Sequence, residues 1–379
     1  MKLSFVKYLV IKIICLFFII PAYAQENLKI DAQMKQAIED ITLTIIPGLS
    51  VAIANSDGLI WSGASGYSNI EDRQFVSQNH SFAIGNISNS FVAVVILQMA
   101  EEKMLNLNST PQAILGDMVK DIENADSATL YELLNHTSGI YSWTNDEDWT
   151  RRARGVQMNP KYKWSKTESL KYITRDRHMA TNAPGGAYAY SSSNYALLGL
   201  IAEKVGGGLI EDEVRKRILE PLKLNNTYYD GFEIIPVGRR VGSYHLATNQ
   251  FISIVGINAK FPFGTDDLIN SSGASLSSEG IASGMVSTPR DIALFGVALR
   301  KGLLINETSL SHIKTPFIEG IHSGVLGFTS DIRWLTQGDL VLVSFANLGT
   351  LGGGRSEASD YLNTYVEKII LPIAKKYAK

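Results

Sequence analysis

The stretch Ser81-Phe-Ala-Ile-Gly85-Asn86-Ile-Ser88-Asn89-Ser-Phe91 leads directly into an apolar segment. Large apolar residues follow at helical spacing, at Val92, Val95, Ile96 and Met99. This pattern predicts a helix that begins near Gly85. Asn86 and Asn89 are three residues apart, so their side chains would share one face of that helix. We therefore expect two amide side chains to stand together where the helix begins.

The N-terminus is typical of a secretory signal peptide. Lys2 and Lys7 precede or border an apolar run from Tyr8 to Ile20, and Pro21-Ala-Tyr-Ala24 follows. This order predicts cleavage after Ala24. The run is interrupted by lysine at position 12 and is shorter than the roughly 20 apolar residues of a membrane span. We expect residues 1–24 to be removed, leaving residues 25–379 without a stable membrane span, in the bacterial periplasm or secreted.

The composition excludes several classes of site. The only cysteine, Cys15, lies inside the predicted signal peptide, so a disulfide or a thiolate metal site is not expected in the mature chain. The six histidines are scattered without metal-ligand spacing, and we expect neither a metal nor a cofactor. Acidic and basic residues are interspersed and the formal net charge is -2, which gives no sign of nucleic-acid binding.

Apolar runs and turns indicate the fold class. A turn at 55–58 joins 48–54 to 59–63 and predicts a β-hairpin. Further strands are expected at 324–333 and 339–347, and a last helix from near Ser356 to Lys379, with a break at Pro372. Helical spacing fills the middle of the chain, over 86–104, 127–135, 193–205 and 209–219. We predict an α/β (α+β) fold: an antiparallel sheet flanked by helices, with an inserted all-helical lobe. The sheet lobe would span about 25–85 and 285–379, and the helical lobe about 86–284.

Four more segments complete a recurring set of motifs. Two of them are Tyr190-Ser-Ser192, which precedes a helical segment, and His322-Ser323-Gly324, which precedes Gly327-Phe328. The other two are Leu133-Leu-Asn-His136-Thr-Ser138-Gly139 and Ala282-Ser-Gly-Met-Val-Ser287-Thr-Pro-Arg-Asp291. In this order, and together with the first stretch, they resemble the motifs of the serine β-lactamase/DD-peptidase-like family, which includes class C β-lactamases, penicillin-binding proteins and esterase relatives.

The resemblance implies a site with altered chemistry. The family places a nucleophilic serine and a lysine at the positions of Asn86 and Asn89. A serine nucleophile needs a group that removes its proton, and an amide is neither a useful nucleophile nor a base at neutral pH. Tyr190 matches the tyrosine that assists proton transfer, whereas Ser192 replaces an asparagine that contacts the substrate amide.

The resemblance also places a strand beside the site. His322, Ser323 and Gly324 match the motif on the strand that flanks the cleft, and the N–H of Val325 would complete an oxyanion hole with the N–H of Asn86. His136 and Ser138 form an obvious pair, but in the family this segment is a structural turn. The residues that we expect to line a ligand-binding cleft are Asn86, Asn89, Tyr190, Ser192, His322, Ser323, Gly324 and Val325.

Three functions remain open at this point. The first is a degenerate serine hydrolase that is inactive or strongly impaired and binds a cell-wall peptide or another envelope protein without forming a covalent bond. The second is an active esterase or peptidase with a relocated nucleophile, for which Ser88, Ser90 and the serines of 191–193 are available and His322 is the only plausible base. The third is a structural envelope protein with a collapsed cleft, in which Asn86 would bond to Ser192 or Tyr190.

Overall fold

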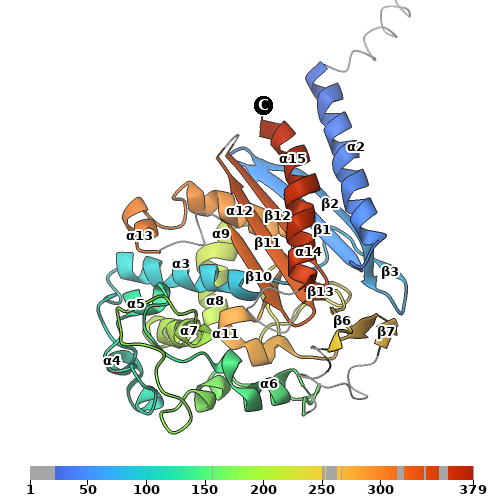
Figure 1. Cartoon of the computed structure of the whole chain (residues 1–379). Helices are drawn as coiled ribbons and strands as arrows, with labels where there is room; N and C mark the ends of the chain where they lie inside the picture. Colours follow the sequence, from blue (N-terminus) through green and yellow to red (C-terminus); the bar gives the residue numbers. More distant parts are fainter. Residues whose placement is uncertain are drawn as a thin grey trace, which may run out of the picture.

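The computed structural model describes residues 22–155, 157–249, 252, 263–265, 267–313, 320–336, 339–349 and 357–378. Its main sheet has the strand order β10-β11-β12-β1-β2-β3, and all of its neighbouring strands are antiparallel (Figure 1). The strands are β1 Gly48–Asn55, β2 Gly58–Asn69, β3 Gln74–Phe75, β10 Ile321–Val325, β11 Phe328–Leu335 and β12 Leu340–Ala346. Strands from the two ends of the chain therefore lie side by side, as the sequence predicts.

Both faces of this sheet are buried. In β1, Leu49, Val51 and Ile53 join one apolar cluster, whereas Ala52 and Ala54 join another. Successive side chains of a strand point to opposite faces, so the alternation assigns each cluster to one face. The same division in β12 explains why its sequence is almost entirely apolar.

Helices cover the two faces. Helix α12 (Pro289–Arg300) packs against β1 and β12 on one face. Helices α2 (Ala22–Thr42), α14 (Glu357–Tyr365) and α15 (Leu371–Ala374) lie on the other, where α2 packs against α15 (Figure 1). Among the described helices, none is long and apolar enough to cross a membrane.

The inserted segment is built around three helices that contact one another, α3 (Ser88–Glu101), α7 (Ser192–Gly206) and α11 (Gly280–Ser283). Helix α3 is buried almost all round, from Ser88 to Leu97, which is the behaviour of a central helix. The other described helices are α4 Pro111–Leu115, α5 Leu130–Leu134, α6 Glu147–Ala153, α8 Ile210–Val214, α9 Glu220–Leu222 and α13 Glu307–Ser311.

Several short strands also occur that the sequence did not predict. They are β4 Phe82–Ala83, β5 Tyr228–Tyr229, β6 Tyr244–Leu246, β7 Phe263–Thr265, β8 Leu268–Asn270, β9 Met285–Ser287 and β13 Leu348–Gly349. They form two small sheets, β13-β6-β8-β7 and β4-β9-β5. Strands of two or three residues leave little periodicity to detect.

The predicted elements differ mainly at their ends. The hairpin of β1 and β2 is confirmed, and the helix expected at 127–135 begins only at Leu130, because Thr129 and Glu132 form a capping box. The strand expected at 324–333 was wrong: Leu326 and Gly327 make a turn, which splits it into β10 and β11. Most of the predicted signal peptide, residues 1–21, lies outside the described residues.

Candidate active site

The candidate site lies at the N-terminal end of α3. A 3₁₀ turn, Gly85–Ile87, precedes the helix and carries Asn86. Gly85 has a φ of 52°, and a Cβ atom at this position would collide with the hydroxyl of Ser323. Glycine is therefore needed for this turn to approach β10 so closely. Asn86 remains partly exposed, whereas Asn89, one turn further on, is 4% exposed.

Two hydrogen bonds join Asn86 to serines of other elements. Its backbone N–H donates to Oγ of Ser323 at 2.6 Å, and its side-chain Oδ1 accepts from Oγ of Ser283 at 3.2 Å. We expected this N–H to point into an empty oxyanion hole and, in the collapsed form, the side chain to bond to Ser192 or Tyr190. Both expectations are corrected, because Ser323 and Ser283 are the partners.

Strand β10 forms one edge of the described sheet and lies against the 3₁₀ turn. A two-residue turn places Val325 directly opposite Phe328, and the residues that flank such a turn bond to each other across the hairpin. The N–H of Val325 is therefore directed toward β11. The assignment of Val325 as an oxyanion donor was wrong, since it is the backbone of Gly324 that faces the open edge.

Tyr190 lies in a cluster of neutral groups. Its hydroxyl is 3.3 Å from Oγ of Ser192. Burial raises the pKa of Tyr190, against hydrogen bonds to Ser192, Asn89 and Ser283 that lower it. With the pKa raised above its ordinary value of about 10, the phenol is protonated at neutral pH. Tyr190 is thus held in its neutral form, with its hydroxyl hydrogen-bonded within the cluster.

Ser283 is the residue that sequence reasoning missed. It ends α11 and is 5% exposed. When the segment that ends at Asp291 is aligned on Ser287 and Thr288, Ser283 stands where the family motif has glycine. The signal in the sequence that pointed to Ser283 was a serine at a position where the family motif has glycine.

The two histidines of the motifs, His322 and His136, lie in different parts of the fold. His322 lies on β10 opposite Asp331, but its side chain lies outside the described residues. His136 is 8% exposed, and its Nδ1 accepts the N–H of Ser191 at 3.2 Å. Ser138 donates instead to Oδ1 of Asn194 at 2.7 Å. His136 and Ser138 therefore hold α7 in place and do not act as a pair.

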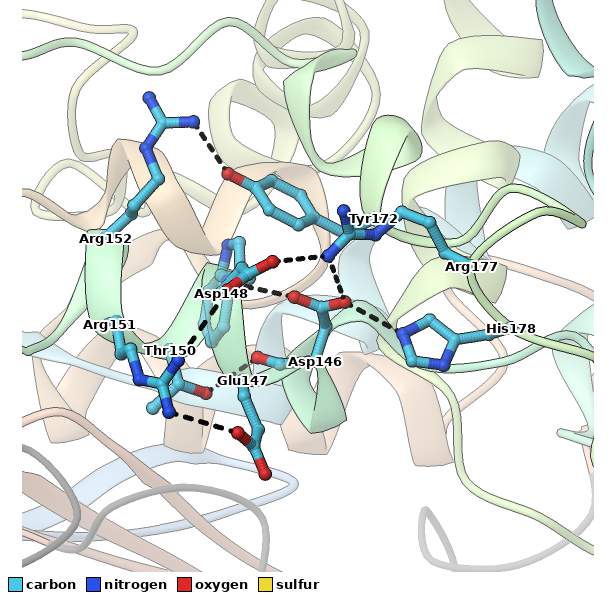
Figure 2. A network of polar contacts seen from close by, with 10 residues as sticks. Asp146, Glu147, Asp148, Thr150, Arg151, Arg152, Tyr172, Arg177 and His178 are labelled. Carbon is cyan, nitrogen blue, oxygen red and sulfur yellow. Dashed lines mark hydrogen bonds and ion pairs between the residues drawn. The ribbon is translucent and has the colours of Figure 1, made fainter.

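A network of charged side chains is centred on Asp146, at the start of α6 (Figure 2). Asp146 caps α6 through the N–H of Trp149 at 2.9 Å, and its Oδ2 bonds to Arg177 at 2.9 Å and to Nε2 of His178 at 2.8 Å. Burial alone would raise the pKa of Asp146, but these hydrogen bonds lower it. Four residues earlier, Oγ of Ser142 accepts the N–H of Ser192 at 3.1 Å. The network therefore fixes the loop that positions Ser192.

A buried ion pair supports α11, which carries Ser283. Nε of Arg154 donates to Oε1 of Glu279 at 2.8 Å, and NH2 donates to Oε2 at 2.7 Å. Both side chains are less than 5% exposed. Glu279 directly precedes α11, so this pair joins that helix to the end of α6.

We expect Glu279→Gln to lower the free energy of unfolding by about 3 kcal/mol or more, because it leaves a buried guanidinium without its counter-charge. Urea unfolding at pH 7 measures this. Glu147→Gln is the matched control, since Glu147 pairs with Arg151 at the surface and such pairs contribute less than about 1 kcal/mol. Equal losses in the two variants would contradict the assigned role of the buried pair.

The described residues contain no group of three or more His, Cys, Asp or Glu side chains arranged to hold a metal. The site is instead a set of amides, hydroxyls and one phenol, contributed by α3, α7, α11, β10 and the segment that precedes α7. These groups lie where the edge strand β10 meets the turn that precedes the central helix α3.

The family described as "Beta-lactamase" matches residues 35–348, and the chain belongs to this family. Protein flp of Staphylococcus aureus (strain COL) is 26% identical over 190 residues, which are 48% of this chain and 35% of that protein. The chain thus matches only about a third of the length of this relative.

Solved structures share the fold across nearly the whole chain. The D-amino acid amidase of Ochrobactrum anthropi SV3, in complex with L-phenylalanine amide, has a TM-score of 0.77 at 20% identity and covers 92% of this chain and 100% of its own. The octameric penicillin-binding protein homologue of Pyrococcus abyssi has a TM-score of 0.68 at 20% identity and covers 93% and 78%. At this identity the likeness shows the fold alone.

Proposed function

We propose that this protein is an exported member of the β-lactamase family that does not form an acyl-enzyme and acts by non-covalent binding. The observation that carries the proposal is the chemistry at Asn86 and Asn89. Neither amide can attack a carbonyl or accept the proton of a nucleophile at neutral pH. Loss of a serine nucleophile alone costs on the order of a millionfold in turnover in another serine hydrolase.

The state of Tyr190 supports the same conclusion. A tyrosine can act as a base beside a cation that lowers its pKa, but burial raises the pKa of Tyr190 and its hydrogen-bonding neighbours are neutral. The N–H of Asn86, which would stabilise an oxyanion, is already bonded to Ser323. At the family positions the site therefore lacks a nucleophile and a base, and one of the oxyanion donors is already hydrogen-bonded within the protein.

The alternative of a relocated nucleophile receives little support from the hydroxyls near the site. Ser88 is fully buried and accepts the N–H of Met285 at 3.3 Å. Ser193 donates to the carbonyl of Tyr141 at 2.6 Å. Ser192 has Tyr190 beside it, which is protonated. Within the described part of the chain, none of these hydroxyls bonds to an imidazole, an amine or a carboxylate.

The ligand and the location complete the proposal. Export with removal of residues 1–24 would place the protein in the periplasm or outside the cell. Membership of the β-lactamase family, which resembles penicillin-binding proteins in its motifs, is our reason to propose a peptide of the cell wall, or another envelope protein, as the ligand. A family-based description as a hydrolase would then reflect descent and not present activity.

Intact-mass spectrometry tests the proposal. The purified protein is exposed to a fluorophosphonate and, separately, to a penicillin, and no increase in mass is expected from either. A stoichiometric adduct would overturn the proposal. Peptide mapping would then identify the nucleophile, and replacement of that serine by alanine would abolish the adduct.

A further inference from the structure

Asn89 carries a polar atom that nothing in the described protein satisfies. Its side chain is 4% exposed, and its Oδ1 is buried without a hydrogen-bond partner among the described residues. Such an atom costs about 1–3 kcal/mol when it stays unpaired, and the large majority of buried polar atoms have a partner. The orphan oxygen can therefore accept a hydrogen bond from a water molecule or from a group of a ligand.

The surroundings of Asn89 place this oxygen in the candidate site. Asn89 hydrogen-bonds to Tyr190, whose hydroxyl also lies near Ser192 and Ser283. Asn86, on the same side of the helix entrance, bonds to Ser283. Asn86 and Tyr190 are both partly exposed, so the cluster reaches the surface of the protein at these two residues.

The chemistry of the cluster limits the class of donor. The atoms that meet here are amide, hydroxyl and phenol groups, without a carboxylate among the described partners. A buried ammonium without a counter-charge pays several kcal/mol in lost hydration, which favours a neutral donor. A primary carboxamide supplies two N–H groups and one carbonyl, so it can donate to Asn89 and accept from a neighbouring hydroxyl.

We infer that the site binds a ligand through an uncharged primary carboxamide, whose N–H donates to Oδ1 of Asn89. This inference rests on the proposed non-covalent function and specifies the group that is recognised. It needs no bond to form or break. It also gives a reason for a polar amide, and not an apolar side chain, at this buried position.

Three matched probes test the inference on the natural protein. Phenylacetamide has the proposed donor, N,N-dimethylphenylacetamide lacks both N–H groups, and phenethylammonium carries a charge in their place. We expect phenylacetamide to bind at least tenfold more tightly than either of the others, a difference of about 1.4 kcal/mol. Titration calorimetry gives the affinities, and the side-chain NH₂ signal of Asn89 in a ¹⁵N-labelled sample reports whether binding occurs at this residue.

A substitution provides the second test. Asn89→Leu keeps a side chain of similar size without the acceptor, and it should weaken phenylacetamide binding at least tenfold. Asn108→Leu, at an exposed position outside the cluster, should leave binding unchanged. Equal affinity for the dimethyl analogue, tighter binding of the ammonium, an unchanged affinity in Asn89→Leu, or no binding at all would overturn the inference, the last meaning that water alone satisfies Asn89.

The two proposals fail in different ways. If the natural protein is labelled by the fluorophosphonate, the non-covalent function is wrong whatever the carboxamide does. If no adduct forms and the three probes bind equally, only the carboxamide inference is wrong. The ligand series needs no variant, so it remains decisive even if Asn89→Leu does not fold.

Discussion

Covalent labelling by a fluorophosphonate is expected to appear when Asn86 is replaced by serine and Asn89 by lysine in the same molecule. The 3₁₀ turn and α3 hold these two positions on one face, beside Tyr190. The serine would supply the nucleophile, and the lysine would supply the cation and base that the site lacks. An ammonium near Tyr190 would also lower the pKa of the phenol. The change is from no detectable adduct to one adduct per molecule.

The single variants separate the contributions of the two positions. Asn86→Ser alone should label slowly, because no group near position 86 can remove the proton from the serine hydroxyl. Asn89→Lys alone should not label at all. Adding Ser192→Asn to the double variant restores a third family position and should increase the rate further. Time courses of intact mass compare all four proteins.

The hydroxyl of Ser323 is expected to slow labelling of the double variant. In the double variant it would still occupy the N–H at position 86, and an added Ser323→Gly substitution should free this donor and accelerate labelling. Removal of one oxyanion donor typically costs a hundredfold to a thousandfold, so partial relief should be easy to detect. A folded double variant that stays unlabelled would show that the cleft itself has lost its acylation geometry.

Acidification from pH 7 to pH 4.5 is expected to destabilise the protein by several kcal/mol. Burial lowers the pKa of His136 to about 4 and that of His245 to about 3. Both are neutral in the folded state and have an ordinary pKa near 6.5 when unfolded. The unfolded chain therefore binds more protons below pH 6.5, and stability falls as the pH falls.

Each histidine contributes on the order of 2–3 kcal/mol to this loss at pH 4.5, from the difference in proton binding between the two states. The contacts explain why neither side chain can be protonated freely. Nε2 of His245 accepts the N–H of Gly327 at 2.8 Å, at the turn between β10 and β11. Nδ1 of His136 accepts from Ser191, next to Ser192. A proton on either nitrogen would remove the acceptor.

Two variants isolate the effect. His245→Gln keeps an acceptor but cannot be protonated, and His136→Asn suits the positive φ of 54° at this position. Urea unfolding at pH 7, 5.5 and 4.5 should show a shallower dependence on pH in each variant, even where its stability at pH 7 is lower. A pH dependence as steep as that of the natural protein would mean that other groups cause the loss.

Much of the fold was predictable from local patterns. The hairpin of β1 and β2, the central helix α3 and the apolar strand β12 all have clear periodicity, and motifs in the family order identified the architecture. The glycine at position 327 indicated a turn, but the sequence did not predict the register of the hairpin. A shift of one residue in register reverses which backbone groups face the partner strand. This is why Gly324, and not Val325, faces the open edge.

The candidate site was predictable in part. The replaced positions 86, 89 and 192 follow from alignment of short motifs. The partners of Asn86 do not, because Ser283 and Ser323 are almost two hundred or more positions away in sequence. The state of Tyr190 depends on burial among Asn89, Ser192 and Ser283, which come together only when three helices pack. Pattern reading found the residues, whereas packing determines their ionisation and their hydrogen bonds.

The arrangement of the main sheet has a consequence for the order in which this protein can be made. Strand β1 leaves the ribosome early, yet its neighbour β12 is synthesised almost three hundred residues later. Helix α2 likewise waits for the C-terminal helices, where Tyr365 donates to the carbonyl of Ala37 at 2.8 Å and Lys376 to Gln33 at 2.6 Å. Such distant pairings form slowly. A growing chain would therefore stay open until translation ends, which is compatible with the export that we propose, because an exported chain crosses the membrane before it folds.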